Sequence, residues 1–241
     1  MCNTLIARFS LLFLLLFAVP ALSCAGISPL EQRILGVEHQ YMELQSLEFD
    51  FSQATFTGGR IREGAGNAVF FRPAIKDNSD TSSLELSAIM RWNYTEPTIQ
   101  TIINDGHELL IYTPQDNQMI ISPIDDLEAD ITYAIFTGTG TLLESFAATS
   151  PDPHFLLTPV SDDLEAILLT PKQPHPQIKR IQLWLDKDMI MQRLLMEDHF
   201  ETLTELHFSR IRFNALPTDD PQLRQSLLEL DIQPGTEIIR P

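Results

Sequence analysis

The sequence predicts a mainly β domain with helices (α+β), built on one long antiparallel sheet. Three observations predict this fold class. Apolar and polar residues alternate with a period of two over many short segments, as in strands with one buried face. Glycine-rich or Asn-Asp-Gly turns separate several of these segments, which favours hairpins. Apolar residues at helical spacing occur at the start of the chain and in its middle.

The first residues are typical of an export signal. Arg8 gives a positive start, and residues 9–19 form an apolar run that is too short to span a membrane. We therefore expect residues 1–25 to be a cleaved signal peptide and residues 26–241 to form a single exported domain. Cys24 lies at the cleavage zone, so lipidation of this cysteine in a weak lipobox stays open as an alternative.

The charge of the chain restricts its partners. It has 33 acidic and 16 basic residues, a net charge of −17. Such a surface repels phosphates, so we expect no nucleic-acid partner and no broad contact with an anionic bilayer. The only cysteines, Cys2 and Cys24, fall in or beside the signal. The folded domain is therefore expected to rely on its apolar core rather than on disulfides.

The first helix is expected at residues 28–47. Ser28 is suited to the N-cap, Pro29 to the first turn, and Glu31 completes a capping box. From residue 47 the apolar period changes to two, which predicts strands. Glycines 64 and 66 inside the second strand predict a bulge. The expected strands are residues 47–53, 61–72, 84–94, 98–103, 108–112, 118–122, 155–158, 164–169, 178–185, 189–197, 202–213 and 227–232.

Two short apolar helices are expected in the middle of the chain, at residues 125–136 and 141–148. Leu127 and Ile131 recur at helical spacing in the first of them. Glycines 138 and 140 separate the two helices. Short apolar helices joined by glycines are typical of a movable cover over a binding site.

Several short motifs, in chain order, resemble those of the periplasmic outer-membrane lipoprotein carrier (LolA) family. They are Glu63-Gly64-Ala65-Gly66, Phe71-Arg72-Pro73, Met90-Arg91-Trp92-Asn93-Tyr94 with Pro97, Asn104-Asp105-Gly106 with Tyr112, Pro114 and Gln118, and Leu228-Glu229-Leu230-Asp231-Ile232 with Pro234-Gly235. Their ordered combination carries the resemblance. One departure is an insertion at residues 76–88, between the Arg-Pro and Arg-Trp motifs, which a surface loop accommodates at small entropic cost.

The resemblance implies an unclosed antiparallel β-barrel with an α-helical lid and an apolar cavity. It implies a periplasmic carrier, which binds the acyl chains of lipoproteins. We expect this carrier to be a monomer without cofactors. An inner-membrane ABC-type release complex would supply the cargo and an outer-membrane receptor would accept it. It also implies that Arg72 holds the lid closed. Two alternatives with the same fold remain: a lipid-anchored outer-membrane lipoprotein receptor, and a periplasmic module that senses lipid or binds glycolipid.

Strand parity nominates the lining of the cavity, because alternate residues of a strand point to the same face. If Arg72 points toward the lid, Phe70 does too. The thioether of Met90 suits a cavity for varied partners. The nominated residues are Phe49, Phe51, Phe70, Met90, Trp92 and Tyr94 on the strands and Ile131, Ile135, Leu142 and Phe146 in the lid. The alternative for each of them is an ordinary core position.

The sequence carries no catalytic motif. It lacks a Gly-x-Ser-x-Gly elbow and a His-Glu-x-x-His pair. Its six histidines are scattered. His199 and His207 are expected on neighbouring strands, but two histidines without a third ligand predict no metal site. We therefore expect neither an enzyme nor a metal protein.

Overall fold

The computed structural model describes residues 27–74, 87–123, 135–136 and 142–241. The strands are β1 Ser46–Thr57, β2 Arg60–Phe71, β3 Ile89–Glu96, β4 Gln100–Asn104, β5 Glu108–Thr113, β6 Gln118–Pro123, β7 Phe146–Thr149, β8 Glu165–Pro171, β9 Arg180–Leu185, β10 Met191–Glu197, β11 Leu203–Phe213 and β12 Glu237–Ile239. The helices are α1 Pro29–Met42, α4 Leu142–Ser145 and α5 Pro221–Leu228, with a 3-10 turn at Pro114–Asp116. The expected signal peptide and most of the insertion lie outside the described residues.

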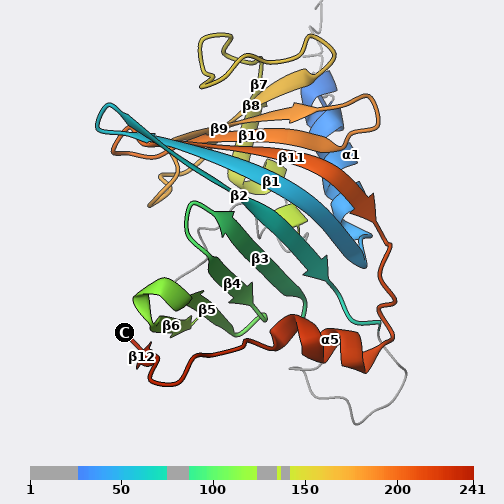
Figure 1. The fold of residues 1–241 in the computed structure, drawn as a ribbon. Helices are drawn as coiled ribbons and strands as arrows, with labels where there is room; N and C mark the ends of the chain where they lie inside the picture. The colour runs from blue at the N-terminus through green and yellow to red at the C-terminus, as the bar shows by residue number, and fades with distance from the viewer. Residues whose placement is uncertain (1–26, 75–86, 124–134, 137–141) are drawn as a thin grey trace, which may run out of the picture.

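The strands form one curved sheet in the order β12-β6-β5-β4-β3-β2-β1-β11-β10-β9-β8-β7 (Figure 1). Every neighbouring pair is antiparallel except β12 and β6, which run parallel. The order is linear and ends at β7 and β12, so the sheet is unclosed. The predicted fold class, a mainly β protein on an unclosed antiparallel sheet, is therefore confirmed.

Helix α1 begins where the sequence predicts and ends earlier. The Ser28 backbone N–H donates to the Glu31 carboxylate (2.7 Å), and the Glu31 N–H donates to the Ser28 hydroxyl (3.2 Å), which completes the capping box. The expected helix at 28–47 is too long at its end, because Ser46 already pairs with Phe71 in the sheet. Ile34 and Val37 are fully buried on the helix face that lies on the sheet.

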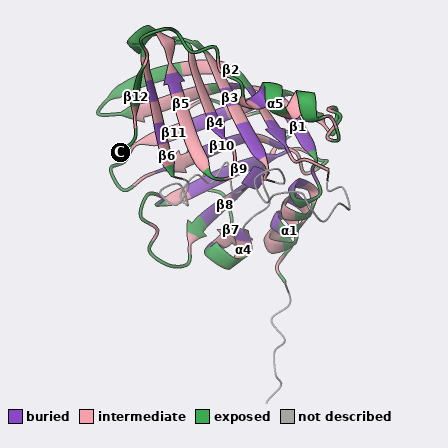
Figure 2. Cartoon of the chain, turned by 90° about the horizontal axis from the view of Figure 1, so that it is seen from below, coloured by how far each residue is buried: buried purple, intermediate pink, exposed green. Residues whose placement is uncertain are grey.

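Both faces of the sheet are apolar over much of their area. We call the face that packs on α1 the concave face, and the opposite one the convex face. Figure 2 shows α1 and α5 on opposite sides of the sheet. The register places Phe49 opposite Ala68, and Ala68 opposite Trp92, on the concave face. Residues of opposite parity, such as Phe71 and Trp184, are buried under covers on the convex face.

Two predicted strands are wrong, because their residues lie in the segments that cover the convex face. Residues 155–158 are a loop whose Phe155 packs on Trp184 and Leu195. Alternating burial in this loop arises because it lies against the sheet rather than within it. Residues 227–232 are the end of α5 and an irregular segment. The start of α5 repeats the signal seen at the first helix, since Asp220 caps it through the Gln222 N–H (2.8 Å) and a proline follows.

The middle of the chain also differs from the prediction. The expected helix at 141–148 is wrong beyond residue 145, because α4 ends at Ser145 and Phe146 begins β7. Although the apolar residues have helical spacing, residues 146–149 pair with β8 as a strand, with Phe146 opposite Pro171. Of the expected helix at 125–136, the structure describes Ile135 and Phe136, which are helical and buried. Residues 124–134 lie outside the described part.

Gly66 lies beside a β-bulge, but the structure places the bulge in β3 and not, as the glycine pattern predicts, in β2. The register between β2 and β3 shifts at Ala65 and Gly66, and the extra residue is Thr95 of β3. A Cβ atom at Gly66 would lie 2.0 Å from the Asn93 carbonyl oxygen and 3.0 Å from the Phe51 ring. A Cβ atom at Gly64 would meet its nearest atom, the Glu96 carbonyl oxygen, at 3.3 Å. Gly66 therefore allows β3 and the Phe51 ring to approach β2.

We expect Gly66→Ala to destabilise the fold by about 1–3 kcal/mol, because the added methyl group overlaps a backbone oxygen that cannot move without breaking the ladder. Urea unfolding followed by circular dichroism measures this difference. Gly64→Ala is the matched control and is expected to have a smaller effect. Equal destabilisation by the two variants would contradict the assignment.

Candidate functional site

The strand residues predicted to line a cavity gather on the concave face. Five of them are buried: Phe49, Phe51, Phe70, Met90 and Trp92. The Trp92 ring lies 5.4 Å from the Phe49 ring and 4.8 Å from the Phe51 ring, centre to centre, with an edge-to-face orientation in both pairs. Such aromatic pairs add stabilisation beyond area burial. The concave face is therefore a continuous aromatic surface.

Tyr94 marks the polar end of this surface. Its ring lies 4.9 Å from that of Phe51, and its hydroxyl donates to the Gln53 side-chain oxygen (2.8 Å). Both side chains are partly buried. Beyond them, β1 continues with Thr55 on the same face. The apolar surface thus ends near Tyr94, toward the turn that joins β1 to β2.

The residues predicted in the lid have three different places. Ile131 lies outside the described residues. Ile135 and Leu142 are buried against the concave core. Phe146 is also buried there, but it belongs to the edge strand β7 rather than to a lid helix. The predicted helix therefore does not include Phe146, which packs in the concave core from a strand.

Phe136 is a central residue that the sequence reasoning missed. Its ring lies 5.3 Å from Phe49, 5.6 Å from Tyr41 and 5.9 Å from Phe208. It is thus inserted between α1, β1 and β11. Helical spacing singled out its neighbour Ile135, and the adjacent aromatic residue at the end of the same segment was the available signal.

Four aliphatic residues extend the concave face beyond Trp92, and the sequence reasoning missed them too. The register aligns Trp92 with Ile102, Ile102 with Ile111, and Ile111 with Ile120. These isoleucines and Leu109, on the same face, are half-buried, whereas Phe49 and Trp92 are buried. Parity carried across each hairpin of strands β3 to β6 would have found them. The concave face is therefore apolar from β1 to β6 but less deeply covered over β4 to β6.

Arg72, predicted to hold the lid, lies at the end of α1. Its guanidinium donates to the carbonyl oxygens of Met42 (2.6 Å) and Leu44 (2.8 Å). It also lies 5.3 Å from the centre of the Phe70 ring. These carbonyls are left without helical partners where α1 ends. Arg72 therefore joins the last turn of α1 to the end of β2.

A few polar contacts hold the other elements of the concave cover. Arg33 of α1 forms an ion pair with Glu165 of β8 (2.5 Å). The Leu143 N–H donates to the Glu38 carboxylate (3.1 Å), and Lys172 donates to the Leu143 carbonyl. All of these groups are exposed or half-buried. Exposed ion pairs contribute little stability, so apolar packing provides most of the attachment.

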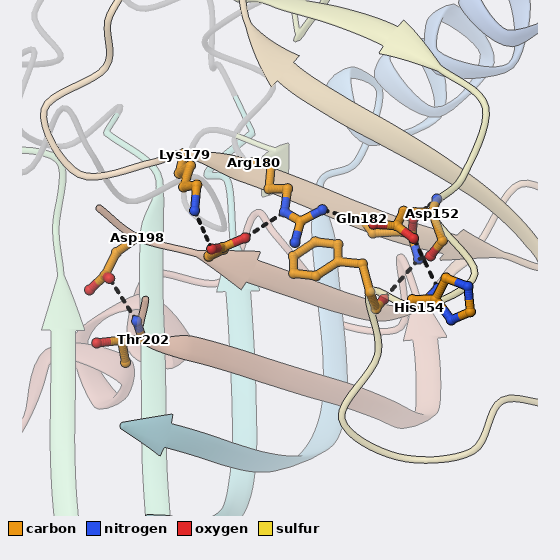
Figure 3. Close-up of polar contacts among 9 residues, drawn as sticks. Asp152, His154, Lys179, Arg180, Gln182, Asp198 and Thr202 are labelled. Atoms are coloured by element: carbon orange, nitrogen blue, oxygen red, sulfur yellow. Dashed lines mark hydrogen bonds and ion pairs between the residues drawn. The ribbon is translucent and has the colours of Figure 1, made fainter. Parts of the chain in front are cut away.

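Charged residues form a network on the convex face instead (Figure 3). Arg180 pairs with Asp152 (2.9 Å) and with Glu197, and its guanidinium lies 3.9 Å from the centre of the Phe155 ring. The buried Gln182 amide donates to the carbonyl oxygens of Asp152 and Phe155. Glu197 also pairs with Lys179. Burial alone would raise the pKa of the Glu197 carboxylate, but the two cations Lys179 and Arg180 outweigh burial and lower this pKa.

A second, more deeply buried part of the network holds the loop at Thr158 and Pro159. Arg193 pairs with Glu205, and both side chains are almost fully buried. Arg193 also donates to the carbonyl oxygens of Thr158 (2.8 Å) and Pro159 (3.2 Å). Its guanidinium lies 4.5 Å from the centre of the Trp184 ring. These contacts tie the loop at residues 150–164 to the sheet, so the network is structural.

The histidines do not meet as expected. His207 lies on β11, with its ring nitrogen 3.0 Å from the Glu205 carboxylate. His199 lies in the turn before β11 and contacts the His175 carbonyl oxygen (2.7 Å). The expectation of neighbouring strands is therefore wrong. Among the described residues, no three His, Cys, Asp or Glu side chains form a metal-binding group.

No helix in the described ranges is long and apolar enough to cross a bilayer. The family model for the outer membrane lipoprotein carrier protein LolA matches residues 88–221, which is more than half of the chain. An outer-membrane lipoprotein carrier protein of Chromohalobacter salexigens is 25% identical over 198 residues, covering 81% of this chain and 80% of that protein. A second, from Nitrosomonas europaea, is 24% identical over 180 residues, covering 75% and 74%.

Among solved structures, a LolA superfamily protein from Nitrosomonas europaea has a TM-score of 0.38 at 14% identity, covering 78% of this chain and 94% of that one. The range matched by the family model begins just before β3 and ends at the first residue of α5. It therefore includes the aliphatic residues of β4 to β6 as well as the whole convex network.

The buried ion pair between Arg193 and Glu205 predicts that the fold loses stability in acid. Burial alone would raise the pKa of Glu205, but hydrogen bonds from His207, Thr158 and Arg193 outweigh it and hold this pKa at about 2. Because a free glutamate has a pKa of about 4.3, the pair stabilises the fold above that pH. This contribution is lost as the pH falls through about 2.

We expect Glu205→Gln to be less stable than the wild type at neutral pH and to lose less further stability between about pH 4.3 and pH 2. Urea unfolding at several pH values measures the free energy of unfolding across this window. The control is Asp162→Asn, which removes an exposed carboxylate from the loop at residues 150–164 that covers the buried pair. Parallel pH profiles for Glu205→Gln and the wild type would refute the pairing.

Proposed function

The chain belongs to the outer membrane lipoprotein carrier protein LolA family, and from this we propose that it carries lipoproteins through the periplasm with their acyl chains on its concave face. The resemblance drawn from the sequence motifs is thereby confirmed. One observation carries the proposal: buried aromatic residues and half-buried aliphatic residues line the same face of an unclosed sheet. In this role the protein binds and catalyses no reaction.

Apolar burial suits a carrier because it is strong and non-directional. Each methylene group removed from water contributes roughly 0.8 kcal/mol, so one acyl chain gains many such increments. Contacts of this kind do not select among lipoproteins by the chemistry of their folded parts. Release needs no nucleotide on the carrier, only an acceptor that binds the chain better. The cargo would come from an inner-membrane ABC-type release complex and pass to an outer-membrane receptor.

Phe136 and the half-buried aliphatic residues suggest how an acyl chain is accommodated. In the structure the Phe136 ring fills the space between Phe49, Phe208 and Tyr41. We propose that a bound chain lies along Ile102, Ile111 and Ile120 and takes the place of the Phe136 ring. The exchange replaces contacts of the Phe136 ring with contacts of the acyl chain, so apolar groups cover this part of the concave face in both states.

Arg72 is proposed to favour the closed, empty state. Its two hydrogen bonds fix the end of α1 to the sheet. A contact that exists only in the closed state shifts the equilibrium toward that state and thus toward release of the cargo. This assigns Arg72 a role in release rather than in binding.

The two tryptophans allow a direct test of which face binds lipid. Trp92 is on the concave face and Trp184 on the convex face, and both are buried. We expect a fatty acid brominated along its chain to quench the fluorescence of Trp92 in the Trp184→Phe variant, because the bromine atoms contact the concave face. In the matched Trp92→Phe variant, Trp184 is expected to keep its fluorescence. Quenching of Trp184 but not of Trp92 would contradict lipid binding on the concave face.

We expect Arg72→Leu to bind lipoprotein at least as tightly as the wild type does and to transfer it poorly, because the loaded state is no longer disfavoured. Transfer from the purified complex to an outer-membrane lipoprotein receptor measures this. Arg91→Leu is a matched control, because Arg91 likewise donates to two carbonyl oxygens, those of Leu227 and Glu229, but on the convex face. If Arg72→Leu transfers its cargo at the wild-type rate, Arg72 has no role in release.

A further inference from the structure

Three turns meet at the end of the sheet farthest from the start of β1. They are the β1–β2 turn at Gly58–Gly59, the β8–β9 loop at residues 172–179 and the β10–β11 turn at residues 198–202. A hydrogen bond of 3.4 Å joins Thr202 to Thr57, and the His199 ring contacts the His175 carbonyl oxygen. Figure 1 shows the turns of β1–β2 and β10–β11 side by side. We call this end the turn tip.

Phe200 projects from the turn tip into solvent. It is 89% exposed, more than any other large apolar residue of the described chain. The Asp198 carboxylate accepts hydrogen bonds from the N–H groups of Phe200 (2.7 Å) and Thr202 (2.8 Å), and Glu201 has a positive φ of 61°. The turn is therefore held in one conformation that leaves the ring outside the core. Ile61, beside the neighbouring turn, is 60% exposed.

The turn tip also carries two unpaired cations. Arg60 and Arg62 flank Ile61 and are exposed. Neither forms an ion pair with any residue that the structure describes. This differs from the exposed Arg33, Arg210 and Arg212, which are paired with acidic residues. In a chain with a net charge of −17, two free arginines beside two exposed apolar residues form a distinct surface.

We propose that the turn tip docks the protein, end-on and reversibly, on an anionic phospholipid surface. Phe200 and Ile61 would enter the interface between headgroups and acyl chains, where such side chains lie in peripheral proteins. Arg60 and Arg62 would bind lipid phosphates while their aliphatic stems remain among apolar groups. Asp198, Glu201 and Glu63 also lie at or beside the tip, but the Asp198 carboxylate accepts hydrogen bonds from two backbone N–H groups. End-on contact keeps the other acidic residues of the chain away from the membrane.

A membrane fits this surface better than a folded protein partner does. The exposed apolar side chains stand at the ends of hairpins, so this surface protrudes. A protein would need a complementary pocket, whereas a bilayer deforms around each side chain. The inference is independent of the concave site, although it adds to the proposed function a way for the carrier to approach the membranes at which cargo is exchanged.

Vesicle co-sedimentation of the exported, purified protein tests the proposal. We expect the protein to bind phosphatidylcholine vesicles that contain phosphatidylglycerol, and to bind pure phosphatidylcholine more weakly. Phe200→Ser is expected to weaken the partitioning roughly tenfold, as the loss of one buried aromatic side chain implies. The double variant Arg60→Gln/Arg62→Gln is expected to lose roughly thirtyfold on the anionic vesicles, as two phosphate contacts imply.

Matched controls lie elsewhere on the surface. Ile238→Ser removes an apolar residue of β12 that is 56% exposed. Lys187→Gln/Arg240→Gln removes two exposed cations that are already paired. Both controls are expected to bind vesicles like the wild type. The proposal is overturned if the wild type does not bind anionic vesicles, or if Phe200→Ser binds as the wild type does. Quenching of Trp92 by brominated fatty acid is read separately, so either proposal can fail alone.

Discussion

An unclosed sheet with two apolar faces has to be covered on both sides, and this constraint governs the whole structure. A closed barrel hides one face by its own curvature. Here β7 and β12 remain edges, so separate segments must bury both sets of alternate side chains. The covers of the two faces are attached by different physical means, and this difference separates the rigid part of the molecule from the part proposed to bind.

The convex covers are held by hydrogen bonds that cannot be broken cheaply. Arg193 and Glu205 lie fully inside the protein beneath the loop at residues 150–164. Arg91 holds the end of α5 through two carbonyl oxygens. Moving the loop would take the Thr158 and Pro159 carbonyl oxygens away from the buried Arg193 guanidinium, which costs free energy because buried donors are left without acceptors. The convex side is therefore a permanent structural layer.

The concave cover depends on apolar packing. Phe136 and α1 contact the sheet mainly through rings and aliphatic groups, and the polar contacts at its margins are exposed or half-buried. Apolar contacts can be exchanged for other apolar contacts at small net cost, whether the new partner is a ring or an acyl chain. This is the physical basis for assigning cargo binding to the concave face and stability to the convex one.

Period-two alternation in the sequence determined most strands and the concave positions of Phe49, Phe51, Phe70, Met90 and Trp92, because side-chain direction follows from local geometry. The capping box at Ser28 was equally local. Only the tertiary structure decided which apolar segments lie on the sheet rather than in it, as at Phe155 and Leu227. It also decided the insertion of Phe136 and the approach of the β10–β11 turn to the β1–β2 turn, since these depend on strand order and register across distant residues, which alternation within one strand does not encode.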